Sequence, residues 1–523
     1  MALGPAAPTV RAPHGLVCSV DHLASAAGVH LLRQGGSAAD AAVAASAVLA
    51  VTTQHMCGMG GDLFALVHHG EPTPAALAAV GRAGTGADPA AMRGEGLAAI
   101  PLHGDVRAAT VPGCVDGWLA LHGRFGRLPL AAVLEPAIDL ARHGFPAAPL
   151  LAASAPLVAD LLGADDYRRP GGLRVGDRVR RPLVAAALEE IVTGGRDAFY
   201  GGAFGEGLVA LGRGLFTLDD LRDPLDRWEE PLVVEAWGHR VWTVPPPSQG
   251  YLSLAGAWVA SGLDLPEDPD DPAWPHLLSE AARWVGHDRP SVLYDGAEGA
   301  ALLDPARLEP MRRSITAERG APPAPAAAGG TIYLCATDAD GMGVSLIQSN
   351  ASGWGCHLVV PGTGIFLHDR GIGFSLEPGH PAELGPRRRP PHTLAPALVT
   401  RVDGSLAAVL GTMGGDLQPQ VVLQLLARLL HGGQSPGRAV SAPRWTLGSG
   451  GFSTWEGSGP QVTSIEHTAP AEWEEGLRER GHDVVRAPRH TNVGHAHAIV
   501  ANPEGGWAGA ADPRALSGAA TGW

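Results

Sequence analysis

The sequence predicts an α+β fold in which helices pack against antiparallel strands. Residues 331–337 alternate as a strand does, and the Asp-Ala-Asp-Gly run at 338–341 is typical of a hairpin turn, because Asp-Gly supplies the positive φ angles that a tight turn needs. Residues 344–347 return as a second apolar strand. Two Ala-rich helices are expected over residues 17–34 and 37–51, and their small side chains allow a close approach to a sheet.

The elements near the N-terminus follow from local signals. Ser37 is predicted to cap the second helix, with Asp40 in its first turn. A strand is expected at 63–68, after a glycine-rich turn at 54–62. The glycines invite comparison with a phosphate-binding loop, but no lysine is present and a strand rather than a helix follows, so the pattern favours a close-packed turn.

The middle of the chain, residues 150–311, is mostly helical in pattern and predicts a helical lobe inserted into the fold. Within it, an apolar strand precedes the Pro-rich loop 245–250, whose rigid geometry suits the wall of a site. Ser248 in this loop has no paired base in the sequence, so a structural role is favoured over a nucleophilic one. Further on, a strand is expected at 407–410 and a helix at 420–430.

The charge balance excludes several kinds of partner. The 523 residues carry a net charge of −15 with a pI near 5.8, and no basic cluster is interleaved with aromatic residues, which argues against nucleic acid and against an anionic membrane surface.

Residues 1–9 lack the pattern of a secretory signal, and the most apolar run, 38–51, is too short to span a bilayer. We therefore expect a cytoplasmic protein with small-molecule partners.

The composition also excludes several mechanisms. All 38 residues counted as Lys or Arg are arginine, so Schiff-base aldolases, pyridoxal enzymes and the Walker phosphate loop are excluded, because each needs a lysine amine. The five cysteines are odd in number and lack Cys-x-x-Cys spacing, so neither a disulfide framework nor a zinc ribbon is expected. We expect no cofactor.

Thr331 lies where an Ala-, Pro- and Gly-rich linker, residues 321–330, meets the first strand of the hairpin. A threonine freed by cleavage at this point can use its own α-amine as the base for its hydroxyl. Such an amine titrates at about pH 8, so it accepts a proton at neutral pH without a histidine. The pattern alone leaves open that Thr331 is an ordinary strand residue, since threonine is common in strands.

The run at residues 329–341 resembles the processing site of the γ-glutamyltransferase family, self-cleaving members of the N-terminal-nucleophile hydrolases. Further motifs spaced along the chain, at 35–67, 111–118 and 411–416, agree with this resemblance. It implies cleavage between Gly330 and Thr331, with Thr331 as the catalytic nucleophile.

Cleavage at that bond divides the chain into a large subunit, 1–330, and a small subunit, 331–523. The resemblance implies that the two stay associated as one four-layer αββα sandwich carrying the helical lobe. It leaves a further homodimer open.

The resemblance also implies roles for residues after Thr331. Ser349 occupies the place of a hydroxyl residue that hydrogen-bonds the nucleophile, and Asn350 lies one position from an asparagine of the family. Gly414 and Gly415 follow an expected strand and precede an expected helix, and consecutive backbone N–H groups there suit an oxyanion hole.

Four residues are implied to bind substrate, and Asn350 is one of them. Arg82 matches an arginine that holds the substrate carboxylate through its bidentate fork, although its neighbours depart from the family pattern. Two serines that bind the α-carboxylate in standard members are replaced here by His392 and Thr393. Polar contact is therefore expected in a reshaped pocket.

Two other patterns are weighed and not favoured. Residues 433–437 fit the Gly-x-Ser-x-Gly elbow of lipases, but they follow a helix rather than a strand and contain proline. His490, His495 and His497 look like metal ligands, yet no acidic partner lies at ligand spacing, so no metal site is expected.

The departures from the family pattern bear on the substrate. The acid that meets a γ-glutamyl ammonium is missing from the matching stretch, residues 372–375, so either Asp369 or another acid replaces it or the substrate has no ammonium. We expect an amidohydrolase for a carboxylate-bearing acyl group. A true γ-glutamyltransferase or glutathione hydrolase remains an alternative, and so does an unprocessed, inactive binding protein.

Overall fold

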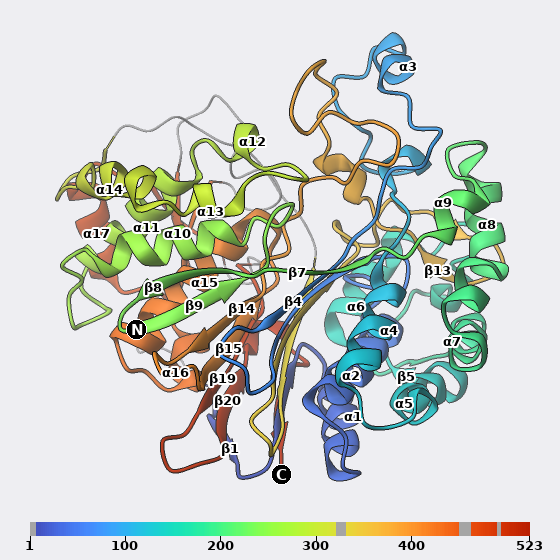
Figure 1. Cartoon of the computed structure of the whole chain (residues 1–523), viewed down its shortest axis with the longest axis horizontal. Coiled ribbons are helices and arrows are strands. Elements are labelled where there is room, and N and C mark those ends of the chain that lie inside the picture. Colours follow the sequence, from blue (N-terminus) through green and yellow to red (C-terminus); the bar gives the residue numbers. More distant parts are fainter. Residues whose placement is uncertain (1–6, 321–330, 449–461, 489–492) are drawn as a thin grey trace.

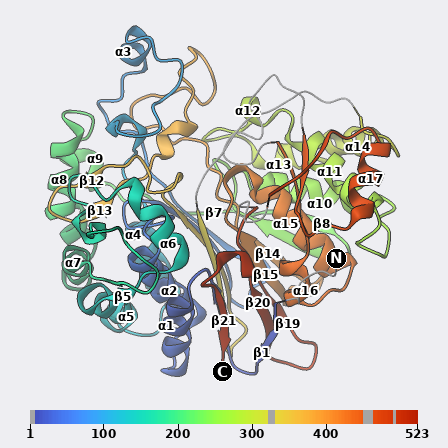
Figure 2. The same ribbon diagram turned by 180° about the vertical axis from the view of Figure 1, so that it is seen from behind.

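The computed structural model describes residues 7–320, 331–448, 462–488 and 493–523. Two seven-stranded antiparallel sheets occupy its centre, and helices lie on the outer side of each (Figures 1 and 2). Sheet A contains, in spatial order, β1 (Val10–Ala12), β20 (Trp507–Ala511), β19 (Ala496–Ala501), β15 (Leu406–Thr412), β14 (Ala397–Thr400), β9 (His239–Thr243) and β8 (Leu232–Ala236). Sheet B contains β21 (Ala519–Gly522), β2 (Leu16–Ser19), β10 (Ile332–Thr337), β11 (Gly343–Ser349), β3 (Asp62–His68), β4 (Ala75–Ala79) and β7 (Asp226–Glu229).

The helices divide between the two sheets. Those on the side of sheet B are α1 (His22–Arg33), α2 (Ala38–Thr52), α3 (Pro89–Gly94), α4 (Cys114–Phe125), α5 (Leu130–His143), α6 (Pro149–Ser154), α7 (Pro182–Tyr200), α8 (Ala203–Gly212) and α9 (Leu218–Arg222). Those on the side of sheet A are α10 (Tyr251–Ser261), α11 (Ala273–Gly286), α12 (Arg289–Val292), α13 (Gly299–Leu302), α14 (Pro305–Arg313), α15 (Gln418–Leu426), α16 (Pro436–Ser441) and α17 (Ala471–Glu479). Short strands form smaller sheets: β5 (Phe145–Pro146) with β6 (Arg178–Val179), β12 (Val359–Val360) with β13 (Ile365–Phe366), and β16 (Trp445–Leu447), β17 (Thr463–Ile465) and β18 (Val484–Arg486).

An apolar core lies between the two sheets. Phe64 and Tyr333 of sheet B belong to the same buried cluster as Leu398 and Val409 of sheet A. Two further clusters join each sheet to its helices, so both faces of the central strands are covered. As a result every residue of β10 and β11 is buried.

The predicted hairpin is confirmed. β10 and β11 pair from Ile332 opposite Gln348 to Thr337 opposite Gly343, and Gly341 in the turn has a φ of +85°. The positive φ is the reason that glycine occupies this position.

The first predicted helix begins later than expected. Residues 17–19 belong to β2, which pairs with β10 and β21, and Asp21 caps α1 by accepting from the Leu23 N–H at 2.9 Å. The residues of β2 are buried in the sheet, and in the sequence their apolar pattern resembles the first turn of an apolar helix. The second helix is confirmed, since Ser37 and Asp40 form a reciprocal capping box at the start of α2.

The predicted helical lobe is not a separate unit. Residues 150–311 include β7, which joins sheet B beside β4, and β8 and β9, which extend sheet A beside β14. β8 lies at the edge of sheet A, and its side chains alternate in exposure.

Two general properties of the described residues complete the fold. None of their helices has the length and apolar character needed to cross a bilayer. The five cysteines are buried.

Candidate active site

Thr331 and Ser349 meet at one end of the central hairpin. Thr331 directly precedes β10 and Ser349 ends β11, so the register of the hairpin places them opposite each other one step beyond the pair Ile332 and Gln348. Their side-chain oxygens lie 2.9 Å apart, and both residues are fully buried. The hairpin register therefore explains the spacing of 18 positions between them.

Ser349 has a well-defined hydrogen-bond environment. Its Oγ accepts from the Ala351 N–H at 2.8 Å and from Arg370 Nη2 at 3.1 Å. A hydroxyl oxygen has two lone pairs, so these two donors leave the Ser349 hydrogen to be donated. Thr331 Oγ1, at 2.9 Å, is in position to accept it.

Arg370 is the site residue that sequence reasoning missed. It begins a 3-10 turn, Arg370–Gly373, is 2% exposed, and donates from Nη1 to Thr393 Oγ1 at 3.0 Å. Burial lowers its pKa to about 10, and nearby carboxylates oppose that fall. Its neighbour Asp369 was named from the sequence, but no local pattern indicates that this arginine points to Ser349.

Gln249 connects Thr393 to the Gly-Gly turn. Its Nε2 donates to the carbonyl oxygens of both Thr393 and Gly415, each at 2.9 Å. Its Oε1 accepts from Arg289 Nε at 3.0 Å, and Arg289 forms an ion pair with the buried Asp416 at 2.9 Å. Hydrogen bonds thus lead from Ser349 through Arg370 and Thr393 to Gly415.

Gly414 and Gly415 follow β15 and have φ angles of +137° and +56°. Both values lie where glycine is favoured. A Cβ built on Gly414 would approach Gly494 at 3.6 Å, so the turn lies against the chain that leads into β19.

His392 is fully buried and is not exposed in a pocket. Its Nε2 is 3.5 Å from Asp62 Oδ2, and its ring packs edge-on to Phe64 with centroids 5.3 Å apart. Burial, together with the charge of Arg370, lowers the pKa of His392 well below its usual range, so the imidazole is neutral. His392 supports the site through packing in this structure.

Two predicted substrate residues are not joined to this hydrogen-bond chain among the described contacts. Arg82 Nη2 donates to the Asp223 carbonyl at 3.3 Å and lies 4.0 Å from the Asp223 carboxylate. Asn350 Nδ2 donates to the Gln54 carbonyl at 2.9 Å, although Asn350 directly follows Ser349. A cavity of about 160 Å³ borders Ala83, next to Arg82, and Phe374.

The remaining candidates have structural contacts. Ser248 Oγ donates to the Leu394 carbonyl at 2.5 Å and accepts from the Gly250 N–H at 3.0 Å, which explains its conformation in the loop. Ser435 of the lipase-like run precedes α16. Gly330 and the linker 321–330 lie outside the described residues.

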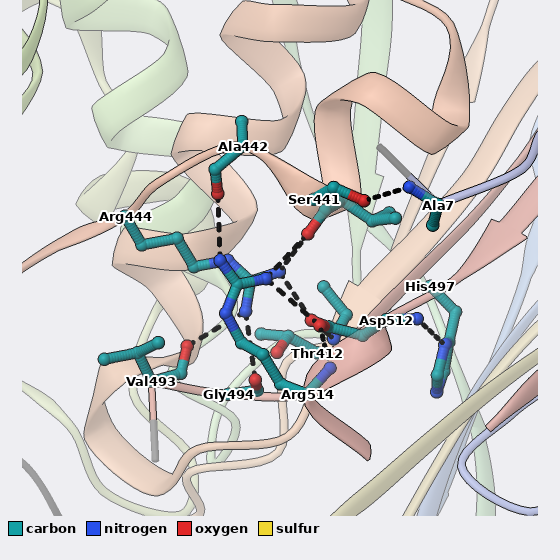
Figure 3. A network of polar contacts seen from close by, with 12 residues as sticks. Ala7, Thr412, Ser441, Ala442, Arg444, Val493, Gly494, His497, Asp512 and Arg514 are labelled. Atoms are coloured by element: carbon teal, nitrogen blue, oxygen red, sulfur yellow. Dashed lines mark hydrogen bonds and ion pairs between the residues drawn. The ribbon is translucent and has the colours of Figure 1, made fainter. Parts of the chain in front are cut away.

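His497, in β19, belongs to a polar network (Figure 3). His497 Nδ1 accepts from the Asp512 N–H at 3.2 Å, and the Asp512 carboxylate accepts from Arg444 at 2.6 Å. Burial lowers the pKa of His495 to about 4 and that of His497 to about 3. Within the described ranges no three His, Cys, Asp or Glu side chains are grouped for a metal, and His490 lies outside them.

The fold and the site match an enzyme class and a family. The structure resembles that of a cephalosporin acylase from Bacillus halodurans, with 30% identity and a TM-score of 0.90, covering 100% of this chain and 98% of that one. This chain is therefore a hydrolase with a fold similar to that of the acylase. It belongs to the γ-glutamyltranspeptidase family, whose model matches residues 24–522, as the sequence resemblance indicated.

Two curated relatives match over almost their whole length. The oxamate amidohydrolase proenzyme of Klebsiella pneumoniae is 36% identical over 98% of this chain and 98% of its own. The glutathione hydrolase-like YwrD proenzyme of Bacillus subtilis is 36% identical over 97% of this chain and 98% of its own.

Proposed function

We propose that the protein is a self-processing amidohydrolase that cleaves a carboxylate-bearing acyl amide through an acyl-threonine intermediate. One observation carries the proposal: Thr331 stands at the start of a central strand with its hydroxyl 2.9 Å from Ser349, beside the buried cation Arg370. The names of the two curated relatives, both proenzymes, support self-processing and amide hydrolysis. The αββα designation of the fold is part of the same proposal, supported by the likeness to the acylase structure.

In the proposed maturation step, Thr331 Oγ1 attacks the carbonyl carbon of Gly330. The C–N bond to Thr331 breaks, the nitrogen takes up a proton, and an ester joins residue 330 to the hydroxyl. Water then hydrolyses this ester, so the chain 1–330 ends in a carboxylate and Thr331 begins the second chain with a free α-amine.

In the proposed catalytic cycle, the α-amine of Thr331 accepts the hydroxyl proton as Oγ1 attacks the substrate carbonyl. The N–H groups of Gly414 and Gly415 bind the oxyanion of the tetrahedral intermediate. Collapse breaks the amide bond, and the α-ammonium returns the proton to the leaving amine. Water activated by the same amine then hydrolyses the acyl ester and restores Thr331.

The proposed acyl group has a carboxylate and no ammonium. Arg82 is proposed to release Asp223 and to bind that carboxylate instead. The ion pair between Arg82 and Asp223 is weak, because the Asp223 side chain is 56% exposed. Asp369, the candidate partner for an ammonium, already accepts from the Ser352 N–H at 2.8 Å, and burial raises its pKa. The existing hydrogen bond of Asp369 and its raised pKa both favour a glutaryl-like donor, which has no ammonium, over a γ-glutamyl donor. Thr393, His392 and Asn350 are proposed to shape the pocket.

The test uses the Thr331→Ala variant with Thr337→Ala as a matched control. Both threonines flank or end β10 and both are buried, but Thr337 lies at the far end of the strand. We expect Thr331→Ala to stay a single chain and to hydrolyse neither glutaryl- nor γ-glutamyl-p-nitroanilide, whereas Thr337→Ala splits and remains active. An intact chain across residues 330 and 331 that still hydrolyses amides would contradict the proposal.

The alternatives give different results in the same assays. A preference of the wild type for γ-glutamyl-p-nitroanilide, with transfer to added amines, would identify a true γ-glutamyltransferase or glutathione hydrolase. A wild-type chain that never splits on a denaturing gel would identify an inactive binding protein. A cytoplasmic location and a further homodimer stay predictions, the second of which sedimentation analysis checks.

A further inference from the structure

Arg370 connects two hydroxyl groups at the proposed site. Nη2 donates to Ser349 Oγ at 3.1 Å and Nη1 donates to Thr393 Oγ1 at 3.0 Å. The guanidinium is planar and its donors have a fixed geometry, so a single buried side chain fixes the position of one hydroxyl relative to the other. A lysine ammonium has three donors on a single nitrogen and lacks this planar fork, so it cannot hold both hydroxyl groups in the same geometry.

The surroundings of Arg370 keep it charged and in place. Three carboxylates face it and raise its pKa against the effect of burial, while Arg289 opposes them; the carboxylates are those of Asp62, Asp369 and Asp416. The Asp62 carboxylate is itself fixed, because its Oδ1 accepts from the N–H groups of Gly81 and Gly113 at 3.0 and 2.9 Å. The hydrogen bonds to Ser349 and Thr393 fix the position of the guanidinium.

We propose that Arg370 is a positioning residue that acts on Thr331 through Ser349. The inference rests on the function proposed above, with Thr331 as nucleophile. The Ser349 oxygen accepts from Ala351 and from Arg370, so its hydrogen is directed to Thr331 Oγ1 at 2.9 Å. A donor bonded to a charged group is strengthened.

The strengthened Ser349 donor acts at two steps of the cycle. It stabilises Thr331 Oγ1 when that oxygen gives its proton to the α-amine, and again when the oxygen leaves the acyl group during deacylation. The bond to Thr393 has a separate effect, because it holds the chain that borders the substrate. Loss of the first contact lowers kcat, and loss of the second raises KM.

A double-mutant cycle tests the inference. The variants are Arg370→Gln, Ser349→Ala and the combination, with Arg401→Gln as the control, since Arg401 donates only to Ser405 and Leu406 in the turn after β14. We expect each single change at the site to lower kcat on the order of 100-fold. The kcat of the combined variant is expected to match that of Ser349→Ala within about twofold, because the proposed effect of Arg370 on kcat passes through Ser349.

Other outcomes separate this inference from the proposed function. Independent, multiplying losses in a cleaved and active enzyme would overturn the role of Arg370 alone. A wild-type chain that is never cleaved before Thr331 would overturn the proposed function and, with it, this inference. If a variant matures slowly, the double-mutant cycle is repeated with the rate of self-cleavage, measured by mass spectrometry, in place of kcat.

Two further measurements exclude a purely structural role. Arg370→Lys is expected to recover part of kcat, because it still donates to Ser349, but to keep a raised KM, because it cannot also hold Thr393. Thermal unfolding of all variants is expected to stay cooperative. Loss of the cooperative transition in every Arg370 variant would make it a core residue and overturn the inference.

Discussion

At the residue scale, Gly414 combines an unusual conformation with a proposed catalytic contact. Its φ of +137° is one that other residues rarely adopt, whereas the nearest atom to a Cβ built there is 3.6 Å away, an ordinary contact. We expect Gly414→Ala to lower kcat about 100-fold, because backbone strain moves the N–H groups that bind the oxyanion. Steady-state kinetics of the cleaved variant measure this.

Gly362 is the matched control for that substitution. Its φ of +77° is equally unfavourable for alanine, and a built Cβ meets nothing within 4 Å. Gly362→Ala is expected to lose a similar amount of stability, about 1–3 kcal/mol, without a change in kcat. Equal kcat losses in both variants would argue that strain alone, rather than an oxyanion contact, explains the effect.

At the element scale, Arg444 fixes the chain that enters β19 (Figure 3). Its Nη1 donates to the carbonyl oxygens of Val493 and Gly494, both at 3.0 Å, and its Nη2 forms the ion pair with Asp512. Gly494 in turn lies against Gly414. The network therefore supports the Gly-Gly turn through the contact between Gly494 and Gly414.

Replacement of Arg444 by methionine is expected to be strongly destabilising. The change removes one of the two arginines that pair with the fully buried Asp512 carboxylate, while Arg514 remains at 3.1 Å. It also leaves the carbonyl oxygens of Val493 and Gly494 without their donor, so a cost of about 3 kcal/mol is expected, near the lower end for breaking a buried pair. Urea unfolding gives the free energy of unfolding. Because the segment behind Gly414 loses its anchor, kcat is expected to fall as well.

Arg478→Met serves as the comparison. Arg478 also pairs with a carboxylate, that of Glu474, but it is 55% exposed. An exposed pair contributes about 0–1 kcal/mol, so this variant is expected to unfold close to the wild type. Equal destabilisation by the two changes would contradict the special role of the Arg444 network.

At the scale of the whole molecule, buried neutral histidines make stability depend on pH. Burial lowers the pKa of His55 and His497 to about 3 and that of His495 to about 4, whereas the unfolded chain titrates at about 6.5. Between these values the unfolded state binds more protons, so stability is lost as the pH falls from about 6.5 to 4. Asp116, whose pKa burial raises to about 6, has the opposite sign and offsets one histidine.

These three histidines and Asp116 together are expected to lower the stability by about 3 kcal/mol per pH unit near pH 5, from two uncompensated histidines at about 1.4 kcal/mol each. The pKa values of His392 and His482 are also lowered by burial, so these two residues add to the loss. Urea unfolding of the single-chain Thr331→Ala variant at pH 7 and pH 5 measures it. His497→Gln is expected to reduce the slope by about 1.4 kcal/mol per pH unit. A stability that does not change between the two pH values would show that these histidines titrate normally.

Several features of the fold and the candidate site were predictable because they depend on neighbours in the chain. The Asp-Gly turn and the alternation around it predicted the hairpin, and Ser37 with Asp40 predicted the start of α2. The family resemblance, confirmed by the match over residues 24–522, directed attention to Thr331 and Ser349.

Other features were beyond sequence reasoning because they depend on long-range contacts. β2 was mistaken for helix, since its partners β10 and β21 are distant in the chain. Of the strands within residues 150–311, β9 was expected before the Pro-rich loop, whereas β7 and β8, at the edges of the two sheets, were not predicted. Arg82 and Asp223 are in contact although they lie 141 positions apart in the chain, so no local pattern predicts this contact.

The amino-acid sequence alone determined the hairpin and therefore the opposition of Thr331 and Ser349, because strand register follows from turn chemistry and alternation over a few residues. Only the tertiary structure decided that Arg370 joins Ser349 to Thr393 and that Gln249 joins Thr393 to Gly415. Such contacts arise when separate loops are packed together at the ends of two sheets, and no short-range pattern records which side chains then meet.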